Sequence, residues 1–370
     1  MKKILLIEGS NNIGGGQIMS SQIIKSLYSD YCIEIFCPSN VNDEFKSLFP
    51  QNIIFHHYKN YQYNRGKKTF LDYLKYTISF LNILLALFKL TKKYKYDLIY
   101  VQHPSLIPHI TIISSLFKIP TIAHIHVVHT DKKVCKIINY CLRTKYYKKV
   151  IGVSNYALSQ FNNISYKSKI IYNCISDFSF TKKDFIHSDI RIGVLGDICP
   201  SKGQALLMES LSKINNNLNI QVQFAGPIVD KDYKQDIINK YHIKTTFLGR
   251  ITNIDSYLDN IDLIIIPSTC EFETFSLAMV EAWKKGRYTI ASNLGGMKEL
   301  VKTFLPQYQE YLLFEKNNSL DLKYKIEKYI ELPTEEKNKI IHALQLIASK
   351  EFSFISFKNK IIEQVKLITK

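Results

Sequence analysis

Two glutamates, Glu273 and Glu281, are separated by seven residues and bracket a stretch of the chain that could bind a phosphate group. The apolar run 261–267 before them ends in proline, which predicts a buried strand of a parallel sheet. After Ser276, apolar side chains recur with helical spacing until Gly286. A helix that begins just beyond the carboxyl end of a parallel strand exposes free backbone N–H groups. Such a position binds anions.

The free N–H groups of this turn are expected at Phe275, Ser276 and Leu277. Carboxylates repel phosphate, so Glu273 and Glu281 are better suited to accept hydrogen bonds from neutral hydroxyl groups on either side of it. A diphosphate that joins a sugar to a ribose would meet this requirement. Two simpler roles stay open: Glu273 could complement the helix dipole, and Glu281 could be a solvated surface charge.

The segment from Glu273 to Glu281 resembles the E-x7-E signature of the retaining GT-B glycosyltransferases, called glycosyltransferase family 4 or group 1. Pro267-Ser268 before the segment, and Gly295-Gly296 with Glu299 after it, also match this pattern. The resemblance implies an α/β protein of GT-B fold, in which two Rossmann-like, doubly wound parallel-sheet domains face a central cleft. It also implies that Glu273 contacts the transferred sugar, that Glu281 contacts the ribose, and that the amides of residues 275–277 bind the donor diphosphate.

Strand and helix patterns alternate along the chain, and a length of 370 residues favours two domains. We expect residues 1–180 to form a Rossmann-like acceptor domain and residues 188–350 a Rossmann-like donor domain, with the polar stretch 176–188 as a linker. The resemblance implies that the C-terminal helix, 352–370, packs back on the first domain. The longest apolar stretch, 70–90, is interrupted by charged residues, so we expect a packed crossover helix. A helix that lies on a membrane is the alternative.

A glycine-rich turn follows the first expected strand, Ile4–Glu8, and contains Gly14, Gly15 and Gly16. Such a turn lets a ligand approach the backbone closely, although it could also be only a tight turn. Its spacing is not G-x-G-x-x-G, so the sequence gives little support for a nicotinamide or flavin site. The resemblance places Gly15 and Gly16 at the donor-binding site.

Two histidines, His124 and His126, stand at the end of the strand expected at 121–127. Strand alternation puts both side chains on the same side, and strand ends can reach a ligand crevice. No nearby set of Cys, Asp or Glu completes a metal site, so no metal is expected here. No cofactor is expected either. The resemblance implies a histidine beside the transferred sugar and favours His126, with His124 as the alternative.

A lysine, Lys202, precedes a second expected helix start at Gln204 and is placed to offset phosphate charge; a solvated lysine is the simpler alternative. Similar enzymes carry an arginine five residues earlier, where this sequence has Asp197. The exchange removes one cation from the implied diphosphate clamp, and it predicts weakened activity or an unusual donor. As a hypothesis, Arg250 replaces part of the missing charge and contributes to donor binding.

The net charge of +17 is concentrated in the first half, where residues 1–187 hold 25 Lys and Arg against 10 Asp and Glu. This half is therefore expected to face an anionic partner. No recognition motif for nucleic acid accompanies the charge, and an anionic membrane surface fits a basic face beside apolar helices better. The seven cysteines show no metal-ligand spacing and indicate reduced thiols in a cytoplasmic protein.

The resemblance thus implies a retaining hexosyltransferase that uses a nucleotide-diphosphate sugar without a tightly bound metal. Because the diphosphate is the leaving group, amides and cations that stabilise its charge would carry much of the rate. The basic first half suggests a glycan or polyprenyl-diphosphate-linked acceptor at the inner face of the cell membrane. The enzyme would then act in bacterial surface polysaccharide assembly (O-antigen, capsule or lipopolysaccharide). The alternatives are a GT-B-fold sugar-nucleotide epimerase and a donor-binding but catalytically weak partner subunit.

Overall fold

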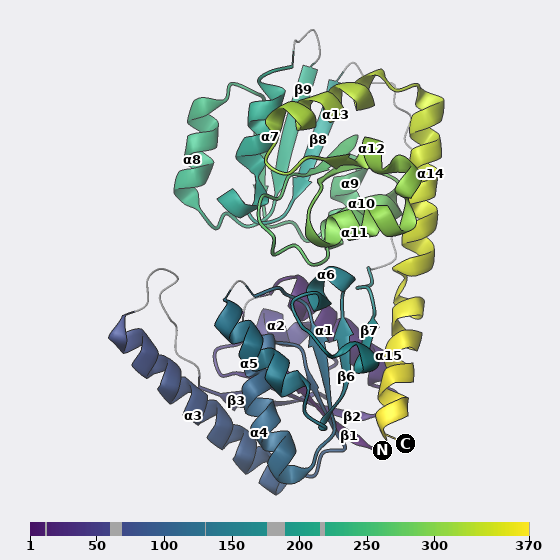
Figure 1. Ribbon diagram of the computed structural model, residues 1–370. Helices are drawn as coiled ribbons and strands as arrows, with labels where there is room; N and C mark the ends of the chain where they lie inside the picture. The colour runs from purple at the N-terminus through teal and green to yellow at the C-terminus, as the bar shows by residue number, and fades with distance from the viewer. Residues whose placement is uncertain (12, 60–68, 130, 176–188, 215–218, 370) are drawn as a thin grey trace. The chain divides into compact units, whose positions relative to one another are not determined.

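The computed structural model describes residues 1–11, 13–59, 69–129, 131–175, 189–214 and 219–369 (Figure 1). The chain divides into two compact units, and each unit contains one parallel sheet. The first unit comprises Met1–Cys174 and Ile355–Lys370, and the second comprises Ile175–Phe354. The linker expected at 176–188 lies outside the described residues.

The sheet of the first unit has seven parallel strands in the order β3-β2-β1-β4-β5-β6-β7. Its central strands are continuous apolar runs that are buried on both faces, as a sheet covered by helices on each side requires. The strands are β1 (Lys3–Ile7), β2 (Cys32–Pro38), β3 (Ile54–Tyr58), β4 (Leu98–Val101), β5 (Thr121–Ile125), β6 (Tyr147–Gly152) and β7 (Ser168–Ile170).

The strand order reverses between β1 and β4, which are neighbours in the sheet. Right-handed crossovers therefore place α1 and α2 on one face and α3, α4 and α5 on the other. Contacts of α4 with both α3 and α5 agree with this layer (Figure 1). The helices are α1 (Gly15–Leu27), α2 (Asp43–Ser47), α3 (Phe70–Lys93), α4 (Ile107–Phe117), α5 (Lys132–Leu142) and α6 (Asn155–Leu158), with the short 3-10 helices η1 (Pro104–Leu106) and η2 (Ser165–Lys167).

The last helix, α15 (Phe354–Thr369), packs on the first unit although it lies at the end of the chain. The Tyr31 hydroxyl lies 3.1 Å from Thr369 Oγ1, and Lys366 forms an ion pair with Asp30 at 3.7 Å. The chain thus returns to the unit in which it began.

The sheet of the second unit has six parallel strands in the order β10-β9-β8-β11-β12-β13, and its order reverses between β8 and β11. Both sheets are therefore doubly wound. Such sheets bind ligands beyond the carboxyl ends of their strands at this point of reversal, the topological switch point. The strands are β8 (Asp189–Leu195), β9 (Asn219–Ala225), β10 (Thr245–Gly249), β11 (Leu263–Ile266), β12 (Tyr288–Ser292) and β13 (Leu313–Phe314).

The helices of the second unit cover both faces of its sheet; α7 contacts α8, and α10 contacts α9. They are α7 (Gln204–Leu211), α8 (Lys231–Lys240), α9 (Ile254–Asp259), α10 (Leu277–Lys285), α11 (Gly295–Phe304), α12 (Gln309–Leu312), α13 (Ser319–Glu331) and α14 (Thr334–Glu351), with the 3-10 helices η3 (Pro200–Lys202) and η4 (Pro306–Tyr308).

Ion pairs between two buried cations and two partly exposed aspartates hold α9, α10 and β12 together. Lys285, at the end of α10, is fully buried and forms ion pairs with Asp255 at 2.5 Å and Asp259 at 2.9 Å. Arg287 also reaches Asp259 at 3.3 Å, and its Nε donates to the carbonyl of Leu258 at 2.6 Å. These contacts fix the far end of α10, whose first turn follows the predicted phosphate site.

Candidate functional site

Lys202 and Glu273 meet at the switch point of the second sheet. Lys202 ends η3, directly after β8, and Glu273 lies in the turn that follows β11. The Lys202 Nζ donates a hydrogen bond to Glu273 Oε1, and the Ser268 hydroxyl donates to the same oxygen at 3.4 Å. The Glu273 side chain is 12% exposed and that of Lys202 31% exposed, so the pair is largely shielded but still reachable from solvent.

The local charges keep Lys202 protonated. Burial alone would lower the pKa of its ammonium group, but the charge and hydrogen bond of Glu273 raise that pKa above its ordinary value, and the charge of Asp197 adds to the rise. A fixed cation at the carboxyl edge of the sheet is suited to a phosphate group.

Close backbone contacts hold the turn that carries Glu273. The backbone N–H of Gly296, in the first turn of α11, donates to the Glu273 carbonyl at 2.7 Å. A Cβ atom at Gly296 would lie 2.0 Å from the carbonyl oxygen of Thr274. On the other side, Gly203 has φ +72° and a Cβ atom there would lie 1.9 Å from the carbonyl oxygen of Pro267. Only glycine allows these approaches.

The first turn of α10 begins beside this pair. Ser276 is its N-cap, and the Ser276 hydroxyl accepts from the backbone N–H of Met279 at 3.3 Å. The residues Phe275 and Ser276 are buried, whereas Leu277 is partly exposed. Of the three residues whose amides are expected to bind the diphosphate, Leu277 is therefore the most exposed.

Glu281 lies on α10 and is partly exposed. Burial raises the pKa of its carboxyl group to about 7, so both protonation states are populated near neutral pH. A carboxyl group in this state can donate or accept a hydrogen bond to a hydroxyl group, which suits contact with a neutral ligand group.

The loops after β8, β9 and β10 are linked to one another through their backbones. Gly196 N–H donates to the Ala225 carbonyl at 2.9 Å, and Gly226 N–H donates to the Gly249 carbonyl at 2.8 Å. Asp197 and Arg250 are the exposed residues that follow β8 and β10, with β9 between those two strands. Arg250 thus lies two strands from the position that Asp197 occupies.

The first unit has its own buried polar network at the carboxyl end of β1, centred on Glu8. Its Oε1 accepts from the backbone N–H groups of Gly9 at 2.8 Å and Ser10 at 3.1 Å and from Gln17 Nε2 at 3.1 Å. Its Oε2 accepts from the Ser20 hydroxyl at 2.5 Å. This carboxylate therefore fixes the loop between β1 and α1. We did not predict this role, although an acidic residue that ends an apolar strand was the signal for it.

Gly9 and His103 are in close contact at the switch point of the first sheet. They follow β1 and β4, and a Cβ atom at Gly9 would lie 2.4 Å from His103 Cγ. We did not identify His103 from the sequence because it stands outside any recognisable motif. Gly15 and Gly16, which we did single out, form the start of α1. A Cβ atom at Gly16 would meet no heavy atom within 4 Å.

The two candidate histidines have different surroundings. His124 is fully buried within β5, and its Nδ1 lies 2.9 Å from the Tyr100 hydroxyl. His126 follows the end of β5 and is partly exposed, with its ring centre 4.2 Å from that of His124. Burial, followed by the charge of nearby His103, lowers the pKa of His126 to about 3, so His126 is neutral at physiological pH.

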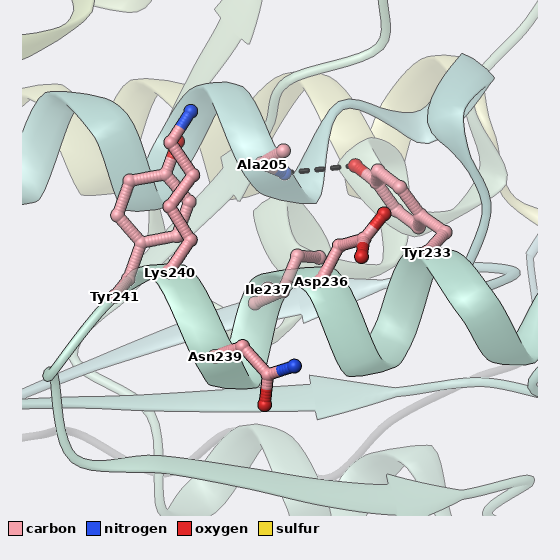
Figure 2. Close-up of a pocket in the computed structure, with 7 residues that line it drawn as sticks. All are labelled: Ala205, Tyr233, Asp236, Ile237, Asn239, Lys240 and Tyr241. Carbon is pink, nitrogen blue, oxygen red and sulfur yellow. Dashed lines mark hydrogen bonds between the residues drawn. The ribbon is translucent and has the colours of Figure 1, made fainter.

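The described residues contain no group of three or more His, Cys, Asp or Glu side chains arranged to hold a metal ion. A surface pocket of about 450 Å³ lies between α7 and α8, and Figure 2 shows its lining side chains. There the Tyr233 hydroxyl accepts from the Ala205 N–H at 2.8 Å. None of the sequence-predicted site residues lines this pocket.

Comparisons with known proteins agree with the doubly wound architecture. Residues 176–345 match the family model for glycosyl transferases, group 1. An uncharacterized glycosyltransferase of Methanocaldococcus jannaschii is 27% identical over 161 residues, which are 39% of this chain and 41% of that relative. The chain thus matches about two fifths of the relative's length.

Two solved structures are similar over nearly the whole chain. Anabaena HepE in complex with UDP has a TM-score of 0.81 and 21% identity, with 99% of this chain and 100% of that chain covered. A glycosyltransferase from Rickettsia africae has a TM-score of 0.78 and 20% identity, with 100% and 99% covered.

The two parallel-sheet α/β domains have the GT-B fold, as the sequence predicted. Together with the family match in the second unit, this fold supports a glycosyltransferase of GT-B type. More particularly, residues 176–345, which contain Lys202, Glu273 and Glu281, match the group 1 glycosyltransferase domain.

Proposed function

We propose that this protein is a retaining hexosyltransferase whose second unit binds a nucleotide-diphosphate sugar. The observation that carries the proposal is the pairing of Lys202 with Glu273 at the switch point of the second sheet, within the segment that matches the glycosyltransferase model. UDP in Anabaena HepE, and UDP-glucose in a second structure of that protein, support this class of donor.

Each residue of the site has a role in this proposal. Lys202, Arg250 and the amides of residues 275–277 stabilise the diphosphate as it takes up negative charge on leaving. Glu273 accepts hydrogen bonds from the sugar hydroxyls, and Glu281 accepts them from the ribose. Because the Lys202 ammonium is already bound to Glu273, the two side chains are held near the bond between sugar and phosphate before the donor arrives.

The first unit supplies Gly15, Gly16 and His126 to the donor and provides the acceptor surface. A neutral histidine can donate one hydrogen bond and accept another, so His126 would hold a sugar hydroxyl and would not deliver a proton as an imidazolium. The full burial of His124 against Tyr100 favours His126 as the residue that meets the ligand. We propose that neither a tightly bound metal nor a cofactor takes part.

We propose a glycan or polyprenyl-diphosphate-linked acceptor, and a cytoplasmic protein held at the inner face of the membrane during surface polysaccharide assembly. The excess of lysine in the first half supports an anionic, membrane-bound partner. The structure of a lipopolysaccharide outer core galactosyltransferase, WaaB, is similar over 98% of the chain with a TM-score of 0.72 and 15% identity. That likeness is consistent with this setting.

The test is a thermal-shift panel of nucleotide-diphosphate sugars, followed by product analysis with the donor that stabilises the protein most. A ligand that binds only the folded state raises the melting temperature by mass action. We expect one nucleotide class to give a clear shift, and Glu281→Ala to lose it. Failure of every donor to shift the wild-type protein would contradict the proposal.

Product analysis separates the two alternative functions. An epimerase would convert the donor without an acceptor, whereas a transferase needs one. The charge of Asp197 specifically favours the weak-subunit alternative, because it places an acid beside Lys202 at the proposed diphosphate site. That subunit would bind the donor and transfer no sugar to any glycan or lipid acceptor. The retaining mechanism predicts the same anomeric configuration in donor and product.

A further inference from the structure

Helix α3 (Phe70–Lys93) exposes an apolar stripe along most of its length. Its members follow one another at alternating intervals of three and four residues, which places them on one face of a helix. Their side chains are between 39 and 63% exposed. They are Leu71, Leu74, Ile78, Leu81, Leu85 and Phe88.

The opposite face of α3 is packed against its own unit. Ser79, Ile83 and Leu87 are buried there. The Phe80 ring lies 4.0 Å from the ring of His109 on α4, centre to centre. The sequence led us to expect a packed crossover helix, and this face agrees with that expectation. The stripe is the surface that remains uncovered by the described part of the first unit.

Exposed apolar residues also occur on the two neighbouring helices. They are Ile112 and Leu116 on α4, and Ile137 and Tyr140 on α5. In Figure 1, α3, α4 and α5 follow one another along the same side of the first sheet. The six exposed apolar residues along α3 form more than the scattered single apolar residues of an ordinary surface, and such patches mark interaction sites.

The charged side chains on these helices are nearly all basic. The two acids are Asp72, which is buried in the cap of α3, and the exposed Asp131 at the N-cap of α5. The exposed lysines on α3 and α5 and at the C-cap of α4 are Lys75, Lys89, Lys92, Lys93, Lys118, Lys132, Lys133 and Lys136.

We propose that α3, with the exposed residues of α4 and α5, is the surface by which the protein docks on an anionic membrane, and that α3 lies in the plane of that membrane. An amphipathic helix with a basic rim buries its apolar stripe at the boundary between headgroups and acyl chains, and its lysines bind lipid phosphates. The inference deepens the membrane partner proposed above, and it rests on that part of the proposed function alone.

A second copy of this chain fits the α3 surface less well than a membrane does. The exposed lysines of one copy would face those of the other, and no negative charge would neutralise them. A membrane-spanning α3 is also a poorer arrangement. By length and composition α3 could cross a bilayer, alone among the helices of the described residues. To cross a bilayer, however, α3 would have to separate from α4. Its buried face, which includes Ser79 and Asp72, would then be exposed, and its lysines would enter the hydrocarbon.

Vesicle flotation of the full chain tests the proposal, with phosphatidylcholine vesicles that contain or lack phosphatidylglycerol. We expect binding to the anionic vesicles, with a loss at high salt. The double variants Leu81→Glu/Leu85→Glu and Lys89→Glu/Lys92→Glu should each lower the partition coefficient at least about tenfold. The matched control is Leu346→Glu/Lys350→Glu on the exposed side of α14, which should bind as wild type does.

Fluorescence quenching by brominated lipids tests the orientation. The sequence has one tryptophan, Trp283, which is fully buried, so a tryptophan introduced at Leu85 gives a separate signal. We expect brominated lipids to quench Leu85→Trp and to leave Leu346→Trp unaffected. Equal quenching of the two variants would overturn the docking surface.

Three further outcomes would overturn the proposal. They are the absence of wild-type binding to anionic vesicles at low salt, equal binding by the wild type and both α3 variants, and a solution dimer that Leu81→Glu/Leu85→Glu dissociates. Circular dichroism confirms that each variant is folded. The thermal shift with nucleotide-diphosphate sugars is measured for Leu81→Glu/Leu85→Glu as well. A shift equal to that of the wild type shows that this variant still binds the donor when it no longer binds membranes.

Discussion

Lys202 and Glu273, which are 71 residues apart in the sequence, form an ion pair at the reversal point of the second sheet. The pair joins the segment after β8 to the turn that precedes α10. Both side chains are largely shielded, and the turn beneath Glu273 is held by the backbone of α11. Under the proposed function, this ion pair would hold Lys202 near the donor diphosphate and Glu273 near the sugar attached to it.

A double-mutant cycle on this pair tests whether the two residues act together. We expect Lys202→Met and Glu273→Gln each to lower the turnover number by roughly 10²- to 10³-fold, since each removes a preorganised group from the transition state. The double variant should lose less than the product of the two losses, because the residues share one interaction. Transfer assays under donor saturation give the comparison.

The control cycle uses Glu209, on α7, and Lys213, just after α7, which form a surface ion pair in the same unit. Their replacement by Met and Gln should leave turnover within about twofold of wild type, because exposed pairs contribute little. A turnover loss in the double variant equal to the product of the two single losses would show that Lys202 and Glu273 act independently.

Gly296→Ala tests the support beneath Glu273. The added methyl group would lie against the carbonyl of Thr274, so the turn or the start of α11 must shift. We expect at least a tenfold loss of transfer and a loss of stability of about 1–3 kcal/mol. Gly16→Ala is the steric control, since a methyl group there meets no heavy atom within 4 Å and should leave stability close to wild type. Wild-type transfer by a folded Gly296→Ala protein would contradict this prediction.

The fold could be predicted from the sequence to a large extent. Apolar runs such as Ile220–Ala225 are short and bounded by turns, and their alternation with helical patterns predicted two doubly wound sheets. The helix start expected at Gln204 is confirmed, since α7 begins at that residue. The short edge strands β7 and β13 were missed because three and two residues carry too little periodicity to be recognised.

The site was harder to predict, because its geometry depends on contacts between distant segments. The spacing of Glu273 and Glu281 was visible in the sequence, but the ion pair of Glu273 with Lys202 was not. The contact of Gly9 with His103 likewise depends on β1 and β4 lying side by side, 94 residues apart at Ile4 and Leu98. The exposed stripe of α3 could not be predicted, because an apolar helix has the same composition whether its apolar side chains are buried or exposed to solvent.

Replacement of Lys285 tests the ion cluster that fixes the end of α10. Lys285 is fully buried between Asp255 and Asp259, so Lys285→Met leaves two carboxylates without their central cation. Because both aspartates are partly exposed and Arg287 still reaches Asp259, we expect a loss of about 1–3 kcal/mol in the unfolding free energy of the second unit. Chemical denaturation followed by Trp283 fluorescence reports on that unit. A change below about 1 kcal/mol would show that other cations satisfy the two aspartates.

The pH dependence of stability tests the environment of Glu281. Burial raises the pKa of its carboxyl group from 4.5 to about 7, so the folded state holds this proton more tightly than the unfolded state. The stability from Glu281 is therefore fully present below about pH 4.5 and is lost as the pH rises through about 7. Glu281→Gln should flatten this decline in a series of thermal unfolding curves between pH 5 and pH 8. An unchanged slope would show that burial does not raise the pKa of the Glu281 carboxyl group.

The measurement that tests the central claim most directly is calorimetric titration with the nucleotide diphosphate that stabilises the protein most. The account predicts that Lys202→Ala binds it at least about tenfold more weakly, because a fixed cation is lost from the diphosphate site. Lys213→Ala, which removes a surface lysine of the same unit, should bind as wild type does. Equal affinity of folded Lys202→Ala and wild type would contradict the account.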